Sequence, residues 1–210
     1  MILLIGSQKG GAGKSTIAVN LCVEFARQGL DVCLVDADAQ RSASRWHADR
    51  EESGVTPTIA SVEKLGNIRD TLVDLDTRYE MVVVDVAGKD SKEMRTGMTA
   101  AHKMIVTVRP SQFDLDTLPH MSDLVEQVRD FNPDLEVRVL LTQAPTNPNG
   151  SERTDAGEYL SDYPGLRSMQ TIIHERKAYR DVIGEGKGVV EWNNPKARGE
   201  VMELAAELMA

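Results

Sequence analysis

A glycine-rich segment stands between an apolar run and a helical pattern near the beginning of the printed sequence. Residues 8–16 read Gln-Lys-Gly-Gly-Ala-Gly-Lys-Ser-Thr and follow directly on the apolar run 2–6. Glycines let a backbone turn tightly with its N–H groups pointing inward, and the N-terminus of the following helix adds partial positive charge. The order of strand, glycine loop, Lys-Ser and helix therefore predicts a phosphate-binding loop.

The loop carries the groups that a nucleoside triphosphate requires. The Lys14 ammonium can reach the β- and γ-phosphates, and the Ser15 hydroxyl can ligate Mg²⁺. The usual spacing G-x-x-x-x-G-K-[ST] places a glycine at position 8, where this chain has Gln8 followed by a second lysine, Lys9. We expect the nucleotide to be bound by the loop residues Lys9, Gly10, Gly11, Ala12, Gly13, Lys14, Ser15 and Thr16.

Composition narrows the class of protein. A chain of 210 residues is long enough for one domain, 1–210, with a core that needs no disulfides. Its two cysteines, Cys22 and Cys33, form no C-x-x-C pair. This argues against a metal site with cysteine ligands, an iron–sulfur centre and a secreted disulfide framework. With neither a signal peptide nor a membrane span in the sequence, we expect a cytoplasmic protein. The net charge of −9 argues against constant coating of nucleic acid but leaves room for a local basic patch.

Apolar runs alternate with helical patterns along most of the chain. The runs are short and continuous in Val, Ile and Leu, as expected of strands covered on both faces. This predicts an α/β fold, a doubly wound and mostly parallel sheet with helices on both faces, of the P-loop NTPase class. We expect strands at 2–6, 32–36, 81–85, 104–108, 137–142 and 169–173, with a weaker candidate at 58–62.

Three helices have clear boundaries in the sequence. The first spans about 14–28 and is followed by Gly29, a good residue for ending a helix. A second is expected over 116–130, and the last begins at Asn194-Pro195, a side-chain cap followed by proline. Two segments, 143–151 and 184–194, read as loops because they are rich in glycine or in proline and asparagine.

Three aspartates are expected at the carboxyl ends of strands, where open α/β sheets bind ligands. Asp85 follows four apolar residues and is a candidate for the carboxylate on the Mg²⁺ side, with capping of the next turn as the structural alternative. Asp36 can equally cap a turn or take part in catalysis. Asp38 is the better candidate for orienting an attacking water molecule.

The spacing K-G-G-x-G-K-[ST], here Lys9 to Ser15, resembles the deviant phosphate loop of the ParA/MinD group of P-loop ATPases. Residues 36–40, Asp-Ala-Asp-Ala-Gln, resemble the group's first switch, with Ala39 in place of its proline. Residues 85–88 resemble the group's second switch. Residues 109–115 resemble the segment that, in the same group, follows the next strand after that switch. Within the group the chain is most similar to the small ParA proteins of plasmid partition, the ParF type.

This resemblance implies an Mg²⁺-dependent ATPase that dimerises when ATP is bound. It implies that Lys9 reaches the nucleotide of the partner copy, that Lys14 binds phosphate and that Asp38 positions the hydrolytic water. It further implies a ParB- or ParG-like centromere-binding or cargo adaptor protein, non-specific binding to DNA, and residence on the nucleoid while ATP is bound. Contacts to adenine would come from loops after later strands, near Thr142-Gln143.

The sequence is only permissive about DNA. Between residues 163 and 198 seven lysines and arginines stand against four acidic residues, a local net charge of +3. The basic residues are Arg167, Arg176, Lys177, Arg180, Lys187, Lys196 and Arg198. They can form a DNA contact surface, with charge reversal at Arg176 and Lys177 as its test, or an ordinary solvated face.

Two other functions are kept as alternatives. A MinD-like ATPase that cycles on membranes needs a basic amphipathic C-terminal helix, but residues 199–210 contain Glu200, Glu203 and Glu207 and no lysine or arginine. We therefore expect no membrane partner. A biosynthetic ATP-dependent ligase needs a polar pocket for its own substrate, and none is visible in the sequence.

Overall fold

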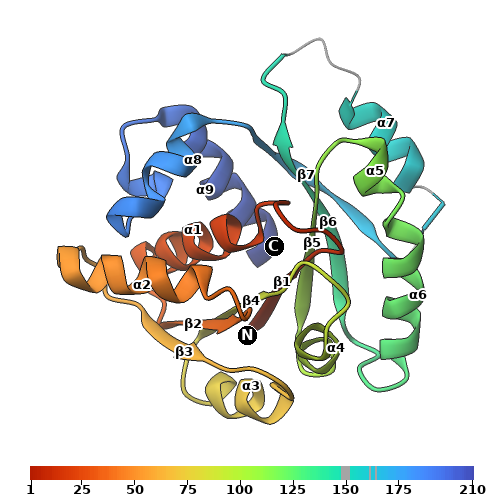
Figure 1. Ribbon diagram of the computed structural model, residues 1–210, viewed down its shortest axis with the longest axis horizontal. Helices are drawn as coiled ribbons and strands as arrows, with labels where there is room; N and C mark the ends of the chain where they lie inside the picture. The colour runs from red at the N-terminus through yellow and green to blue at the C-terminus, as the bar shows by residue number, and fades with distance from the viewer. Residues whose placement is uncertain (148–151, 161, 164) are drawn as a thin grey trace.

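The computed structural model of the chain describes all residues except 148–151, 161 and 164. Its centre is a parallel sheet in the order β3-β2-β4-β1-β5-β6-β7 (Figure 1). The strands are β1 (Ile2–Gly6), β2 (Val32–Ala37), β3 (Ala60–Glu63), β4 (Met81–Val86), β5 (Lys103–Val108), β6 (Glu136–Ala144) and β7 (Arg167–His174). The predicted doubly wound α/β fold is confirmed.

Helices connect the strands and cover both faces of the sheet (Figure 1). They are α1 (Lys14–Arg27), α2 (Ser42–Ser53), α3 (Arg69–Asp76), α4 (Lys92–Met98), α5 (Gln112–Leu115), α6 (Leu118–Arg129), α7 (Glu152–Leu160), α8 (Lys177–Asp181) and α9 (Pro195–Met209). Two short 3-10 helices, η1 (Ile183–Glu185) and η2 (Val189–Glu191), lie between α8 and α9.

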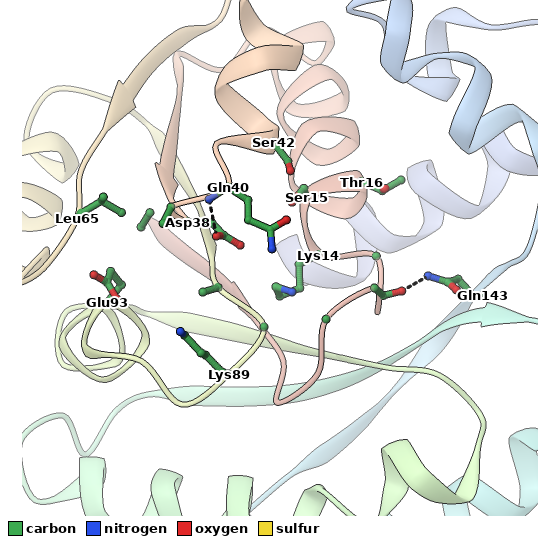
Figure 2. A pocket seen from close by; sticks show the side chains of 17 residues that line it. Lys14, Ser15, Thr16, Asp38, Gln40, Ser42, Leu65, Lys89, Glu93 and Gln143 are labelled. Atoms are coloured by element: carbon green, nitrogen blue, oxygen red, sulfur yellow. Dashed lines mark hydrogen bonds between the residues drawn. The ribbon is translucent and has the colours of Figure 1, made fainter.

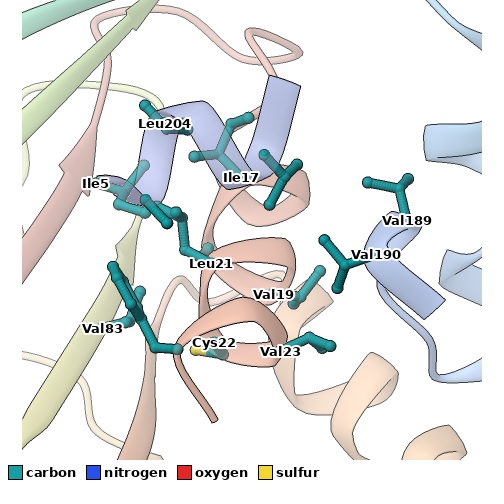
Figure 3. Packing of buried hydrophobic residues seen from close by; sticks show 14 of the residues in the cluster. Ile5, Ile17, Val19, Leu21, Cys22, Val23, Val83, Val189, Val190 and Leu204 are labelled. Carbon is teal, nitrogen blue, oxygen red and sulfur yellow. The ribbon is translucent and has the colours of Figure 1, made fainter. Parts of the chain in front are cut away.

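Successive strand residues point to opposite faces and build two separate cores. From β1, Leu3 and Ile5 pack with α1, η2 and α9, whereas Ile2 and Leu4 pack on the other face with α3, α4 and α6. Figure 3 shows α1 at the centre of the first core, between strand side chains such as Val83 and the C-terminal elements. Because both faces are buried, the strands carry continuous apolar runs.

The predicted strands are all present, and the weaker candidate at 58–62 is β3, displaced to 60–63. The helix expected over 116–130 is α6, which starts at Leu118, and the short α5 just before it was not anticipated. Gly29 follows α1 at φ 93°, and the Asn194 side chain caps α9 by accepting a hydrogen bond from the backbone N–H of Ala197 at 3.1 Å.

Some residues of the two predicted loops belong to a strand or to 3-10 helices. The segment 184–194 contains most of η1 and all of η2. The segment 143–151 begins within β6, and its last residues, 148–151, lie outside the described residues.

The strand order sets the position of the site. β1 lies between β4 and β5, so the connections leaving its carboxyl end diverge at a topological switch point. β2 pairs with β4 in a register that places Asp36 beside Asp85. The loops after β1, β2, β4 and β6 therefore meet at one edge of the sheet. In the described part of the chain, no helix is both long and apolar enough to cross a membrane.

Candidate nucleotide site

The loop between β1 and α1 takes the shape of an anion cradle. Gly11 and Gly13 have φ values of 77° and 79°, which lie in the left-handed region that only glycine adopts freely. Gly13 directly precedes the first turn of α1, so the partial positive charge of this 14-residue helix faces the loop. The local sequence therefore produces the backbone that phosphate binding requires.

The end of β6 anchors this loop from outside. The Thr142 hydroxyl donates a hydrogen bond to the carbonyl of Ala12 at 2.9 Å, and the Gln143 amide donates to the carbonyl of Gly11 at 2.6 Å. Gln143 itself has a φ of 53°, an uncommon conformation for a residue other than glycine. These bonds turn two loop carbonyls toward β6 and away from the space where an anion would bind.

Lys14 places its ammonium inside the site. The residue is 7% exposed, and a Cβ built on Gly88 would lie 2.7 Å from its Nζ atom. The same Cβ would lie 2.6 Å from the backbone carbonyl oxygen of Lys9, which cannot give way as a side chain can, so the loop after β4 needs a glycine at position 88. Burial lowers the pKa of Lys14, and the nearby carboxylates of Asp85 and Asp38 only partly offset this effect. A bound polyphosphate would supply the missing counter-charge.

Asp85, near the end of β4, is a buried carboxylate without partners. It is fully buried, and neither of its oxygens accepts a hydrogen bond from any described residue. Burial raises its pKa to about 7, against the opposing influence of Ser15 and Lys14. Unpaired carboxylate and hydroxyl oxygens are the donors that Mg²⁺ prefers, so the pair Asp85 and Ser15 fits a magnesium ion.

Asp36 and Asp38 differ sharply in their surroundings. Asp36 is 2% exposed and accepts hydrogen bonds from the Ser44 backbone N–H at 2.7 Å, the Ser44 hydroxyl at 2.9 Å and the Asp38 N–H at 3.1 Å. It therefore fixes the start of α2 and the course of the preceding turn. Asp38 is partly exposed and lines the cavity, and one of its oxygens accepts from the Gln40 N–H at 2.9 Å.

A cavity of about 660 Å³ connects these loops. In Figure 2 the side chain of Lys14, at the start of α1, and those of Asp38 and Gln40, in the segment after β2, face this space. Lining residues that the sequence motifs did not indicate are Ser42, Leu65, Lys89 and Glu93. They come from the loop after β3 and from the segments around α2 and α4, which have no fixed spacing relative to the phosphate loop.

A smaller cavity of about 190 Å³ adjoins the first and shares Gly13, Thr16 and Gln143 with it. Its other walls come from Ile17 in α1, from Thr142 near the end of β6, and from the chain that runs from the end of β7 into α8. The predicted nucleoside region near Thr142-Gln143 therefore borders a real cavity.

Lys9 lies apart from the other loop residues. It does not line either cavity, and its Nζ atom stands 3.8 Å from Asp114 and 5.5 Å from the ring centroid of Phe113. Asp114 is buried and accepts two hydrogen bonds from the Arg109 side chain, at 2.7 and 3.0 Å. Phe113 is 78% exposed. The sequence marked residues 109–115 only by resemblance, and the ion-pair cluster within them was not foreseen.

The basic stretch 163–198 is largely neutralised. Lys177, Arg180 and Lys187 pair with Asp181, Glu175 and Glu185 at distances of 2.7 to 3.3 Å. Arg176 is only 17% exposed and bonds to the buried Glu200. Charge reversal at Arg176 would therefore break an ion pair with a buried carboxylate as well as change the surface charge.

Comparisons with known proteins identify the relatives of the chain. A family model described as the CobQ/CobB/MinD/ParA nucleotide binding domain matches residues 3–189. Protein ParA of Rhizobium radiobacter is 33% identical, over 85% of this chain and 80% of its own length. The maintenance of carboxysome distribution protein A of Gloeobacter kilaueensis is 31% identical, over 94% of this chain and 87% of its own length.

Solved structures agree with these matches at the level of the fold. The septum site-determining protein MinD of Pyrococcus horikoshii, complexed with Mg-ADP, superimposes with a TM-score of 0.72. The superposition covers 99% of this chain and 95% of that one at 17% identity.

Proposed function

The chain belongs to the CobQ/CobB/MinD/ParA nucleotide-binding family of P-loop ATPases, and from that premise we propose that it is a partition-type ATPase that works as a switch. In this proposal ATP and Mg²⁺ bind in the larger cavity and two ATP-loaded copies form a homodimer. The dimer binds DNA without sequence preference, and a ParB- or ParG-like adaptor positions plasmid, chromosome or other cargo. Hydrolysis then separates the copies and releases the DNA.

The negative charge of the phosphates determines where the nucleotide binds in this proposal. The triphosphate lies against the amides of residues 10–15 and the Lys14 ammonium, where the start of α1 adds positive charge. The nucleoside extends past Gly13 and Thr16 into the smaller cavity beside Thr142 and Gln143. The MinD structure that superimposes on this chain contains Mg-ADP, which supports this choice of ligand.

Ser15 and Asp85 would hold the magnesium ion, with Asp85 acting through water. When bound, Mg²⁺ supplies positive charge that neutralises the phosphate oxygens. Asp38 is the group that orients the attacking water, because it is a partly solvated carboxylate at the cavity wall, whereas Asp36 is fully engaged with Ser44 and the turn.

One observation supports the proposed homodimer. Lys9 belongs to the phosphate loop yet does not line the cavity that the loop encloses. It stands at the rim beside the exposed ring of Phe113. A lysine in this position is suited to the nucleotide of a second copy rather than its own. Because both ATP molecules then lie in the interface, nucleotide binding and association stabilise each other.

DNA binding rests on cations that bond to backbone carbonyls rather than to carboxylates. Arg27 donates to the carbonyl of Val190 at 2.7 Å, and Arg198 donates to that of Trp192 at 2.8 Å. These groups gather around η2 and offer phosphate contacts that dimerisation would double.

The alternatives find less support. In a membrane-cycling ATPase the last helix would need a free apolar face, but α9 buries Val201, Leu204, Ala205 and Leu208 against the core. A biosynthetic ligase would turn over ATP only with a metabolite present. Stimulation by DNA and an adaptor would instead favour the switch.

The decisive experiment is sedimentation of the chain with ADP, with ATP and with a slowly hydrolysed ATP analogue. We expect a monomer with ADP and a dimer with the analogue. Lys14→Ala should weaken ATP binding at least about tenfold and remain a monomer, because it loses a charged contact to phosphate. Retained affinity in that variant would remove the phosphate-loop assignment, and a monomer at saturating analogue would overturn the switch.

A further inference from the structure

A buried carboxylate behind the smaller cavity forms hydrogen bonds with side chains that make up one wall of this cavity. Glu200 in α9 is 8% exposed. Its Oε1 atom bonds to His174 Nδ1 at 2.8 Å and accepts from Nε and Nη2 of Arg176 at 2.9 and 2.6 Å. The Tyr179 hydroxyl donates to Oε2 at 3.0 Å. His174, Arg176 and Tyr179 all line the cavity, whereas Glu200 does not.

These contacts fix the orientation of the wall. Arg176 uses two of its N–H groups on one carboxylate oxygen, which restricts the guanidinium and leaves further N–H groups for a ligand. Burial raises the pKa of Tyr179 and the neighbouring Glu200 raises it further, so the hydroxyl keeps its proton and acts as a donor. A long arginine side chain without such a partner would sample several rotamers.

We propose that Glu200 is a positioning residue for nucleotide binding: it holds Arg176, His174 and Tyr179 in the arrangement that receives the base and ribose. The inference deepens the proposed function and rests on it, since the smaller cavity adjoins the phosphate loop through Gly13 and Thr16. Glu200 acts through these side chains and contacts neither phosphate nor magnesium.

The same helix provides a matched control. Glu207 lies seven residues further along α9 and also accepts hydrogen bonds from β7, from the N–H groups of Gln170 and Thr171 and from the Thr171 hydroxyl, at 2.7 to 2.9 Å. Neither Gln170 nor Thr171 lines a nucleotide cavity. Glu207→Gln therefore weakens the same helix–strand contact without touching the proposed wall.

The experiment compares MgATP with magnesium tripolyphosphate, which has the phosphates but no nucleoside. Calorimetry on the full chain should show that Glu200→Gln raises the Kd for MgATP about tenfold, because the loss of charge weakens the bonds that order Arg176. The Kd for tripolyphosphate should change by less than about twofold, as expected for independent sites. Glu207→Gln should leave both constants within that range.

Equal weakening of both ligands by Glu200→Gln, or no weakening of either, would overturn the inference. If Glu200→Gln fails to fold, Arg176→Lys provides the second test, because it keeps the charge and loses the paired contact with Glu200; it should show the same selective loss for MgATP. The proposed function fails separately, if the unmodified chain binds neither ligand or if Lys14→Ala binds both normally.

Discussion

The Nζ atom of Lys9 lies 3.8 Å from a carboxylate oxygen of Asp114, 105 residues further along the chain. Burial opposes ionisation of Asp114, yet Arg109 and Lys9 together hold its pKa below the usual range. The carboxylate is therefore charged and keeps Lys9 at the rim of the site. In a single copy this lysine is therefore held by its own chain.

Lys9→Ala should bind ATP normally and lose hydrolysis. Its side chain lies outside both cavities, so the Kd for MgATP should change by less than about twofold. Turnover should fall at least about 100-fold, because the cation from the partner copy is absent when charge develops on the phosphates. Calorimetry and phosphate release measure the two quantities.

The control for Lys9 is Lys92→Ala, which removes another exposed lysine at the start of α4. This variant should retain full turnover. Unchanged turnover in Lys9→Ala would mean that Lys9 is an ordinary surface lysine, and the dimer would then need another explanation.

Asp38→Ala and Asp36→Ala should fail in different ways. Asp38→Ala removes the group that orients water, so it should bind ATP, lose about 100-fold or more in turnover and sediment as a lasting ATP dimer. Asp36→Ala removes the acceptor for Ser44 at the start of α2. It should lower the free energy of unfolding by about 2 kcal/mol, because it loses a cap and leaves buried donors unpaired.

Urea denaturation and single-turnover hydrolysis distinguish the two aspartates. Normal hydrolysis by Asp38→Ala would move the catalytic role elsewhere. An Asp36→Ala protein as stable as the unmodified chain would contradict the capping role that its hydrogen bonds indicate.

Asp85 should give the ligand-free protein a characteristic pH dependence. Its pKa is about 7 in the folded state against an ordinary 3.8, so the folded state holds the proton more tightly. The protonated Asp85 side chain contributes fully to the free energy of unfolding below about pH 4. This contribution is lost as the pH rises through 7, at a rate on the order of 1 kcal/mol per pH unit. Asp85→Asn should lack this component in urea titrations between pH 4 and 8.

The proposed magnesium ion would reverse the protonation preference of Asp85. A nearby cation favours the charged form of a carboxylate, so MgATP should release protons on binding at pH 6 to 7, and this release should be absent in Asp85→Asn. Calorimetry in buffers of different ionisation enthalpy measures the proton count. Identical proton release by the two proteins would show that Asp85 does not serve the metal.

Local patterns predicted the parts of the fold that depend on local physics. The glycine loop, α1 and the buried strands follow from backbone freedom and from apolar runs, so their positions were anticipated to within a few residues. The division of the segment 112–129 into α5 and α6 was missed, although Pro119 in the first turn of α6 is a signal for a helix start.

Contacts between distant residues could not be predicted in this way. The approach of Gly88 to Lys14 depends on the packing of two loops, and the pairing of Arg176 with Glu200 depends on how α9 lies against β7. In the sequence Arg176 is one of seven cations in a basic stretch, and only the fold reveals that its charge is neutralised internally. Such contacts join residues that are far apart in the sequence, and no local pattern of residue types specifies the distance between them.

The DNA surface proposed around η2 gives the last prediction. Arg27→Glu with Arg198→Glu should weaken retention of a non-specific duplex by the ATP-analogue dimer at least about tenfold and lower the salt slope by roughly one for each lost contact. Arg69→Glu, at the start of α3, with Arg78→Glu, just after its end, is the matched pair. Each pair takes the formal net charge from −9 to −13, because every reversal removes one positive and adds one negative charge. A mobility assay across a salt series should show weaker DNA retention for the first pair than for the matched pair. Equal losses in the two pairs would show that total charge alone governs retention, and no loss in the first pair would show that the contact surface lies elsewhere.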